Sequence, residues 1–202
     1  ISSVRIVRAL LLFYNKFTMP ELPEVETIRR GLSNKILNKQ IVNIDIKKPN
    51  LVRNKVANFK ASLKDNAILS IDRIGKLLIL DLADKNFLLI HLKMTGQLIY
   101  SSKDDLIAGG HNFPSVDNLP NKYSYIIFSF ADNSKLFFND MRQFGYMHLV
   151  NKNIKQKIKA RFGIEPGTKN FTLRNFRAIM KSRRGVLKAL LLNQQIISGI
   201  GN

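Results

Sequence analysis

The central part of the sequence, residues 41–138, alternates short apolar runs with turn-forming residues. The runs are rich in Ile, Leu, Val, Phe and Tyr, and Asn, Asp, Gly, Lys and Pro separate them, as is typical of β-strands joined by turns. Because no helical period interrupts this stretch, we predict an antiparallel β-sandwich or barrel and not a parallel α/β sheet. Turns are predicted at 84–86 and 132–134, and a long loop at 104–120. The predicted strands are 41–47, 67–73, 76–82, 87–92, 97–100, 123–130, 135–138 and 146–150.

Helical spacing of apolar residues appears on both sides of this stretch. The apolar residues before it are Val25, Ile28, Leu32 and Ile36. With Pro23 suited to a first helical turn, they predict an amphipathic helix over residues 23–36. After residue 151 the helical period returns, and two short helices are predicted at 171–180 and 186–192. The fold class is therefore predicted to be α+β, with a β-sandwich domain at 20–150 and a helical domain at 151–202.

The charge of the chain limits its partners. It has 33 Lys and Arg against 14 Asp and Glu, a formal net charge of +19. The basic residues are spread along the whole chain, which favours a polyanionic partner, and nucleic acid more than a membrane.

The chain has no Cys, which excludes disulfides and thiolate metal sites within it. No apolar run reaches the length of about 18 residues that a membrane span needs. The three His residues show no metal-ligand spacing, so we expect no metal and no cofactor within this chain.

The two ends of the sequence stand apart from the rest. Residues 1–18 begin with Ile1, carry three basic residues and no acid, and precede the first methionine, Met19. We favour their interpretation as upstream sequence before a start at Met19, so that residues 1–19 form a leader with the initiator Met. A targeting peptide, including an organellar one, and a structural extension remain alternatives. At the other end, Gly199-Ile200-Gly201-Asn202 has the composition of a loop that leads into a further element.

The segment that follows Met19 begins with Pro20 and Glu21. Removal of Met19 leaves Pro20 with a free secondary amine. An α-amine has a pKa of about 7.7 to 8.0, so roughly a tenth of it is unprotonated at pH 7. Such an amine can attack a masked aldehyde, for example sugar C1′, and form an iminium that accepts electrons. Glu21 is placed to transfer protons in the same reaction. The alternative is a plain helix cap, since Pro and acids are ordinary at a helix start.

Five separated motifs bear on these alternatives. They are Pro-Glu-Leu-Pro-Glu-Val-Glu-Thr at 20–27, Lys-Leu-Leu-Ile-Leu at 76–80, His-Leu-Lys-Met-Thr-Gly at 91–96, Asp-Met-Arg-Gln-Phe-Gly at 140–145 and Gly-Ile-Gly-Asn at 199–202. In order and spacing the chain from Met19 to Asn202 resembles formamidopyrimidine-DNA glycosylase. Its opening is less similar to endonuclease VIII, which typically begins Pro-Glu-Gly-Pro-Glu. The resemblance implies excision of 8-oxoguanine and formamidopyrimidines from damaged double-stranded DNA, followed by β,δ-elimination at the abasic site.

The resemblance also implies a role for each matching catalytic residue. Pro20 matches the Schiff-base nucleophile and Glu21 the acid/base, while Glu24 belongs to the shell of the active site. Lys76 matches the lysine that neutralises phosphate and assists elimination. Taken alone, Lys76 is more typical of a solvated charge at a strand end.

A second group of residues matches the DNA contacts of the family. Met94, Arg142 and Phe144 match the trio that fills the gap left by an extruded base, whereas core packing is the alternative for Met94 and Phe144. The helical part resembles a helix-two-turn-helix motif, in which Lys188 and Asn202 match contacts to the DNA backbone. A plain helix end is the alternative for the final turn.

The chain departs from the family pattern in three places. The C-terminal zinc finger with four cysteines is absent, so the zinc that the family implies has no ligands here. A Lys-His pair typical of the family is replaced by Lys122-Tyr123, which puts one backbone contact in doubt. With residues 1–18 attached, the nitrogen of Pro20 is a tertiary amide and has no nucleophilic lone pair. The printed chain is therefore expected to be inactive unless Pro20 is exposed.

Two other functions stay open. A non-catalytic module would bind duplex or abasic DNA and leave it uncut, and an RNA-associated basic protein would prefer RNA to duplex DNA. The glycosylase hypothesis implies a monomer without membrane association, located in the cytoplasm with the bacterial nucleoid.

Overall fold

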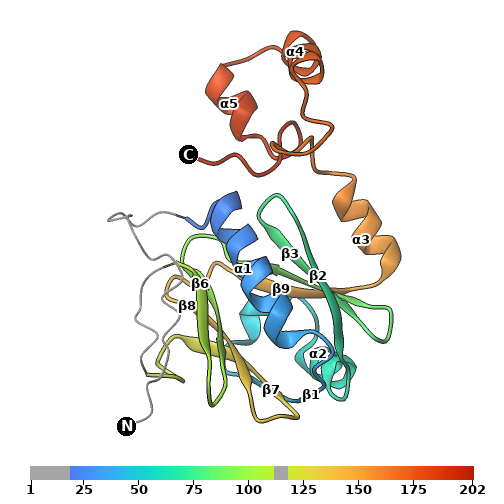
Figure 1. Ribbon diagram of the computed structural model, residues 1–202. Coiled ribbons are helices and arrows are strands. Elements are labelled where there is room, and N and C mark those ends of the chain that lie inside the picture. Colours follow the sequence, from blue (N-terminus) through green and yellow to red (C-terminus); the bar gives the residue numbers. More distant parts are fainter. Residues whose placement is uncertain (1–18, 112–117) are drawn as a thin grey trace.

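The computed structural model describes residues 19–111 and 118–202, so the leader interpretation of residues 1–18 lies outside the described part. The predicted antiparallel β-sandwich is confirmed, and with the helices around it the fold is α+β (Figure 1). One sheet has the strand order β1-β7-β8-β5-β6 and the other β2-β3-β4-β9. The strands of the first sheet are β1 (Ile41–Ile46), β5 (Gly96–Ser101), β6 (Leu106–Gly110), β7 (Ser124–Phe130) and β8 (Lys135–Asp140). Those of the second are β2 (Ile68–Ile74), β3 (Leu77–Leu82), β4 (Phe87–His91) and β9 (Tyr146–Val150).

Both predicted hairpin turns are confirmed. Lys85 and Asn133 adopt positive φ values of 68° and 66°, and the Asp84 carboxylate accepts the N–H of Asn86 at 3.0 Å. The predicted loop at 104–120 is wrong in part, because β6 pairs with β5 along residues 106–110. The two adjacent glycines at the end of β6 hid this strand, since glycine is unusual inside strands. A Cβ on Gly109 would collide with Ile28, so the strand needs glycine there to approach the first helix.

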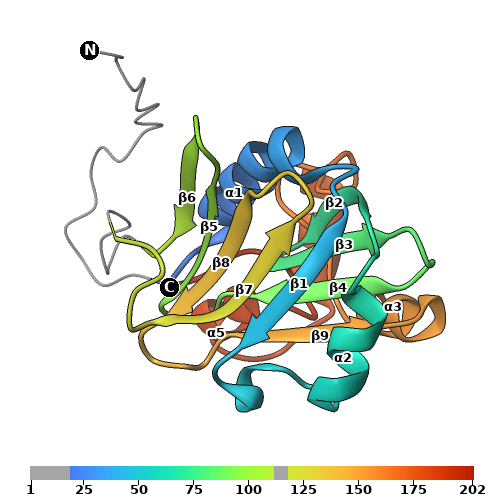
Figure 2. The same ribbon diagram turned by 90° about the horizontal axis from the view of Figure 1, so that it is seen from below.

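Helix α1 (Leu22–Ile36) closes one open side of the sandwich. It packs against the edge strands β6 and β2, which belong to different sheets, and Figure 2 shows it lying across the gap between them. Its predicted apolar face is confirmed, since the side chains of that face are at most 3% exposed. This burial fixes where the start of α1 lies, and therefore where Pro20 lies.

The opposite side of the sandwich is closed by two elements that the sequence did not predict. The 3₁₀ helix η1 (Pro49–Leu51) contacts β9, and helix α2 (Val56–Leu63) contacts β1. Phe59 and Leu63 of α2 are fully buried. One i, i+4 pair in eight residues is too short a pattern to separate a helix from a loop, which is why α2 was missed.

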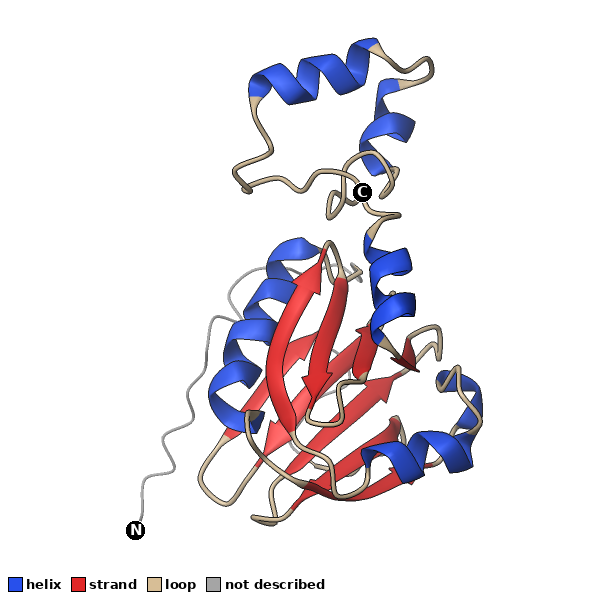
Figure 3. Cartoon of the chain, turned by 90° about the vertical axis from the view of Figure 1, so that its right-hand side faces the viewer, coloured by secondary structure: helices blue, strands red, loops and turns tan. Residues whose placement is uncertain are grey.

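Three further helices follow the sandwich: the first lies against its four-stranded sheet, and the other two lie beyond one end of it (Figure 3). Helix α3 (Lys152–Lys159) packs Ile158 against the outer face of the four-stranded sheet, beside Leu89 and Val150. The two helices predicted after it are observed as α4 (Leu173–Lys181) and α5 (Leu187–Leu192). No helix in the described ranges is long and apolar enough to cross a membrane.

A group of ionic contacts joins α1 to the sheet. The Glu26 carboxylate accepts hydrogen bonds from Arg29 at 2.8 Å, from Arg30 at 2.7 Å and from Arg73 of β2 at 2.7 Å. The hydrogen bond from Arg29, with further ones from Arg30 and Arg73, lowers the pKa of Glu26 from 4.5 to about 2, although burial acts in the opposite direction. The carboxylate therefore stays charged down to strongly acidic pH.

Replacement of Glu26 by Gln should change how stability depends on pH. A carboxylate whose pKa is lower in the folded state stabilises above its unfolded pKa, and loses that contribution as the pH falls from about 4.5 to about 2. After allowance for the partial exposure of Glu26, we expect the free energy of unfolding of the original chain to be about 2 kcal/mol higher than that of Glu26→Gln at pH 7. At pH 2 the two free energies should be almost equal. Chemical denaturation at several pH values measures this difference. A difference that stays constant with pH would contradict the assignment.

Candidate active site

Pro20 and Glu21 directly precede α1, and the start of α1 lies at the end of the sandwich that faces the helices of residues 151–202 (Figure 1). Pro20 is buried, and Glu21 is the residue that caps the helix. The backbone N–H of Glu21 donates to the Glu24 carboxylate at 2.9 Å. Glu24 is otherwise exposed, so its clearest contact in the structure is to the peptide that follows Pro20. This bond holds the Pro20-Glu21 unit in one orientation, as in a capping box.

Lys76 lies directly before β3, after a turn in which Gly75 has a φ of +53°. Its side chain is only 8% exposed and forms an ion pair with the Glu21 carboxylate. This contradicts the solvated strand-end charge that composition alone favours. A buried ammonium is costly unless a partner compensates it, and Glu21 is that partner. Two residues that are 55 positions apart in the sequence thus form one charged unit.

The final turn of the described chain covers this pair. A Cβ on Gly201 would collide with the Glu21 carboxylate, and one on Gly199 would collide with Leu22. Gly199 has a φ of +94°, and its N–H donates to Gln194 Oε1 at 2.8 Å. The Gln194 amide also donates to the Ile200 carbonyl at 2.8 Å. These contacts explain the Gly-x-Gly spacing, because only glycine allows the backbone to approach Glu21 this closely.

Asn202 follows this turn and is exposed. Asn202 directly follows Gly201, whose backbone lies against the Glu21 carboxylate. Lys188 is on α5 and is also exposed. Among the residues that the structure describes, no ion pair joins Lys188 to the Glu21–Lys76 pair.

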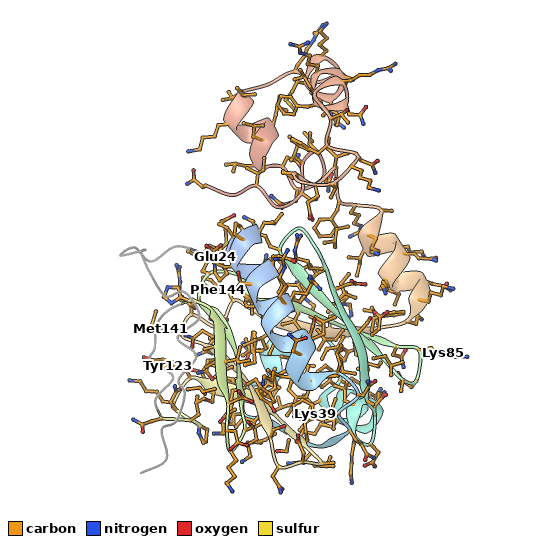
Figure 4. The ribbon with its side chains drawn as sticks, in the orientation of Figure 1. Glu24, Lys39, Lys85, Tyr123, Met141 and Phe144 are labelled. Carbon is orange, nitrogen blue, oxygen red and sulfur yellow. The ribbon has the colours of Figure 1, made fainter. Side chains whose placement is uncertain are left out.

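The three residues predicted to fill the gap of an extruded base come from two loops. Met94 lies between β4 and β5 and is half-buried, while Arg142 and Phe144 lie between β8 and β9. Phe144 is 53% exposed, which argues against core packing for this residue. The Arg142 guanidinium lies 4.8 Å from the centre of the Phe144 ring. Figure 4 shows Phe144 and Glu24 at the end of the sandwich nearest the helical region.

Asp140 connects these two loops. Its carboxylate is fully buried, accepts the hydroxyl of Thr95, and accepts the N–H of Gly145 at 2.7 Å. The backbone N–H of Arg142 donates to Thr95 Oγ1 at 2.9 Å. Both loops are therefore held by one buried carboxylate. Asp140 and Thr95 lie inside the motifs that the sequence showed, but only the structure gives them this supporting contact.

His91 is a further residue to which the sequence analysis assigned no role. Its Nδ1 accepts the N–H of Lys93 at 3.0 Å, in a turn where Lys93 has a φ of +55°. Burial lowers the pKa of His91 from 6.5 to about 3, and the positive charges of Lys93, Lys76 and Arg53 act in the same direction. The ring is therefore neutral at physiological pH and helps to shape the turn that precedes Met94. Its place at the start of the motif 91–96 was the available signal.

The described residues contain no group of three or more His, Cys, Asp or Glu that could hold a metal ion. The zinc finger implied by the resemblance needs four cysteines, and the sequence has none. The residues present therefore do not fit a zinc ion of that kind.

Comparison with known proteins relates this site to a family. The family model "Formamidopyrimidine-DNA glycosylase N-terminal domain" matches residues 19–147. Formamidopyrimidine-DNA glycosylase of Pelotomaculum thermopropionicum is 34% identical over 187 residues, and that of the Wolbachia of Brugia malayi is 36% identical over 184 residues. Each alignment covers 91% of this chain and 63% of the relative.

Solved structures give the same result. The complex of Lactococcus lactis Fpg with DNA that contains an abasic site has a TM-score of 0.76 and 29% identity, and covers 90% of this chain and 63% of that one. A complex of a mutant of the same enzyme with DNA that contains THF has a TM-score of 0.77 and 30% identity. The chain thus spans about 63% of the length of these relatives. By the match of its sandwich and first helix, the chain belongs to the formamidopyrimidine-DNA glycosylase family.

Proposed function

We propose that this chain is the catalytic part of a DNA repair glycosylase that removes oxidised purines, 8-oxoguanine and formamidopyrimidines, and then cleaves the abasic strand. The single observation that carries the proposal is that the buried Lys76 and the backbone of the glycine turn 199–201 both lie against the carboxylate of Glu21, the residue next to Pro20. A capping role for Pro20 and Glu21 gives no reason for a buried lysine or for a backbone seated against the Glu21 carboxylate. A catalytic role explains both features, because the Pro20 amine must react beside a group that donates and accepts protons, and Lys76 and the glycine turn hold Glu21 in that place.

In the proposed reaction the lone pair of the Pro20 nitrogen forms a bond to C1′ of the damaged nucleotide. The glycosidic bond breaks, and the base leaves with the bonding electrons and takes up a proton from solvent. The Glu21 carboxylate accepts the proton that the Pro20 nitrogen loses and delivers it to the ring oxygen as the sugar opens, which leaves an iminium between Pro20 and C1′. Loss of a proton from C2′ then expels the 3′ phosphate, because the iminium accepts the electrons. Lys76 neutralises phosphate charge during this step, and a further elimination releases the 5′ phosphate.

This chemistry requires Pro20 at the N-terminus. Preceded by another residue, its nitrogen is an amide and cannot attack. The proposal therefore applies to a chain that begins at Pro20, whether through the start at Met19 or through cleavage.

The chemistry also requires that the damaged base leave the duplex, which costs a few kcal/mol. Met94, Arg142 and Phe144 are proposed to occupy the gap and to hold the orphaned cytosine. Two observations favour this role, because a side chain that enters the gap must project from the surface and be held rigidly. Phe144 is exposed, and the buried Asp140 carboxylate holds its loop through the Gly145 N–H.

The proposed partner is damaged double-stranded DNA, bound by a monomer in the bacterial cytoplasm. We assign the reaction to a domain at 20–150 and backbone binding to a helical domain at 151–202, through Lys188 and Asn202. The exposed Arg183, Arg184 and Lys188 around α5 also fit a second candidate, a module that binds duplex or abasic DNA without cutting it.

Capture of the imine distinguishes the two candidates. A chain that begins at Pro20 is mixed with a duplex that contains 8-oxoguanine opposite cytosine, and borohydride is added. The proposal predicts a covalent protein–DNA adduct that disappears in the chain with residues 1–19 attached, in which the Pro20 nitrogen is an amide. An identical duplex with a preformed abasic site serves as a control that needs no base excision. Binding without an adduct on either duplex would favour the non-catalytic module.

Truncation of Phe144 should separate base extrusion from the later chemistry. Phe144→Ala is expected to slow excision of 8-oxoguanine by roughly tenfold or more, because the side chain offsets part of the cost of flipping. Cleavage at a preformed abasic site should fall much less. Leu69→Ala is a matched control, since Leu69 is 51% exposed and lies on β2. Equal losses on both substrates, or an equal loss in the control, would contradict the wedge role.

A further inference from the structure

Glu165 belongs to none of the five motifs, yet it connects the helical region to the sandwich. It lies between α3 and α4, and its side chain is 15% exposed. One carboxylate oxygen forms an ion pair with Arg73 Nη1 at 2.6 Å. The other accepts the backbone N–H of Gly75 at 2.7 Å. Glu165 therefore holds the turn between β2 and β3 at two points.

This turn carries Lys76. Gly75 directly precedes Lys76 and adopts a φ of +53°, so the direction of the Lys76 side chain depends on the conformation of the turn. The same Arg73 donates from Nε to Glu26 on α1 at 2.7 Å. Arg73 is 13% exposed and is thus held between a carboxylate on α1 and a carboxylate of the helical region. The chain of contacts links the two elements that supply Glu21 and Lys76.

We infer that Glu165 is a positioning residue that aligns the Gly75-Lys76 turn with Glu21. Its contribution to strand cleavage rests on the proposed function, but its hold on the turn does not. A carboxylate that only joined the two regions would need the ion pair to Arg73 alone. The additional bond to the Gly75 N–H fixes the peptide that immediately precedes Lys76, and a charge-assisted bond of this kind is strong.

The chain offers a matched control for this inference. Lys155 of α3 forms an ion pair with Asp81 of β3 at 3.0 Å, which also joins the helical region to the sheet. Asp81 lies five residues beyond Lys76 along the chain, and within the described residues its ion pair is to Lys155 and not to the turn. Asp81→Ala therefore removes a tie between the same two regions without touching Gly75.

The first measurement uses the full chain and needs no catalytic activity. Amide hydrogen exchange at Gly75 and Lys76 is compared in the original chain, Glu165→Ala, Glu165→Gln and Asp81→Ala. We expect exchange at Gly75 to rise by roughly tenfold in Glu165→Ala, because its acceptor is lost. Glu165→Gln keeps an acceptor for the Gly75 N–H, so its Gly75 exchange rate should lie between those of the original chain and Glu165→Ala. This variant preserves the test if the alanine variant folds poorly. In Asp81→Ala the exchange rate of the Gly75 amide should stay within about twofold of its rate in the original chain.

The second measurement follows the reaction on a preformed abasic site, after release of the residues before Pro20. Capture of the imine reports on Pro20, whereas strand scission also depends on Lys76. Glu165→Ala should lower scission more than capture, and Asp81→Ala should leave their ratio unchanged. Unchanged Gly75 exchange in both Glu165 variants, or equal losses of capture and scission, would overturn the inference. If the original chain forms no imine, the proposed function fails, and the exchange result alone decides whether Glu165 positions the turn.

Discussion

The burial of one face of α1 determines the rest of this structure. The face closes the open side between β6 and β2, and its residues are almost completely removed from water. Burial of four aliphatic side chains contributes several kcal/mol, on the order of 1.5 to 3 kcal/mol each. Because the helix cannot slide without exposing this face, its first residue is held at a fixed place at the end of the sandwich. Glu21 caps that end, and Pro20 directly precedes Glu21.

The charges around this end are arranged so that they compensate one another at short range. A net charge of +19 would oppose a compact cluster of basic groups. Yet Lys76 and Arg73, both nearly buried, each lie against carboxylates, Lys76 against Glu21 and Arg73 against Glu26 and Glu165. The uncompensated positive charge lies instead on exposed side chains such as Arg183 and Lys188. The interior is thus balanced locally, and the excess charge remains available to a polyanion.

Much of the fold could be predicted from the sequence, because its signals were local. The spacing of Val25 and Ile28 predicted α1, and turn residues such as Asp84 predicted hairpins. The missing signals were short or unusual: α2 buries only Phe59 and Leu63 in eight residues, and β6 ends in glycines. Tertiary packing decided both elements, since α2 exists to close a side of the sandwich and β6 needs glycine to approach α1.

The site was predictable as a set of motifs but not as a geometry. Pro20 and Glu21 stood out by their chemistry, whereas Lys76 was indistinguishable from a solvated lysine until its burial beside Glu21 was visible. The contact between Gly201 and Glu21 joins residues 180 positions apart, and no local pattern carries that information. Glu165 lay outside the motifs because its role depends on two partners that are far away in sequence.

The central claim is that the nitrogen of Pro20, and not the nearby amine of Lys76, bonds to the sugar. The most direct measurement is the location of the sugar on the borohydride-reduced adduct, by digestion and tandem mass spectrometry. The account predicts that the added mass lies on the nitrogen of Pro20, in the tryptic peptide that ends at Arg29. Added mass on the side chain of Lys76, with an unmodified Pro20, would contradict it.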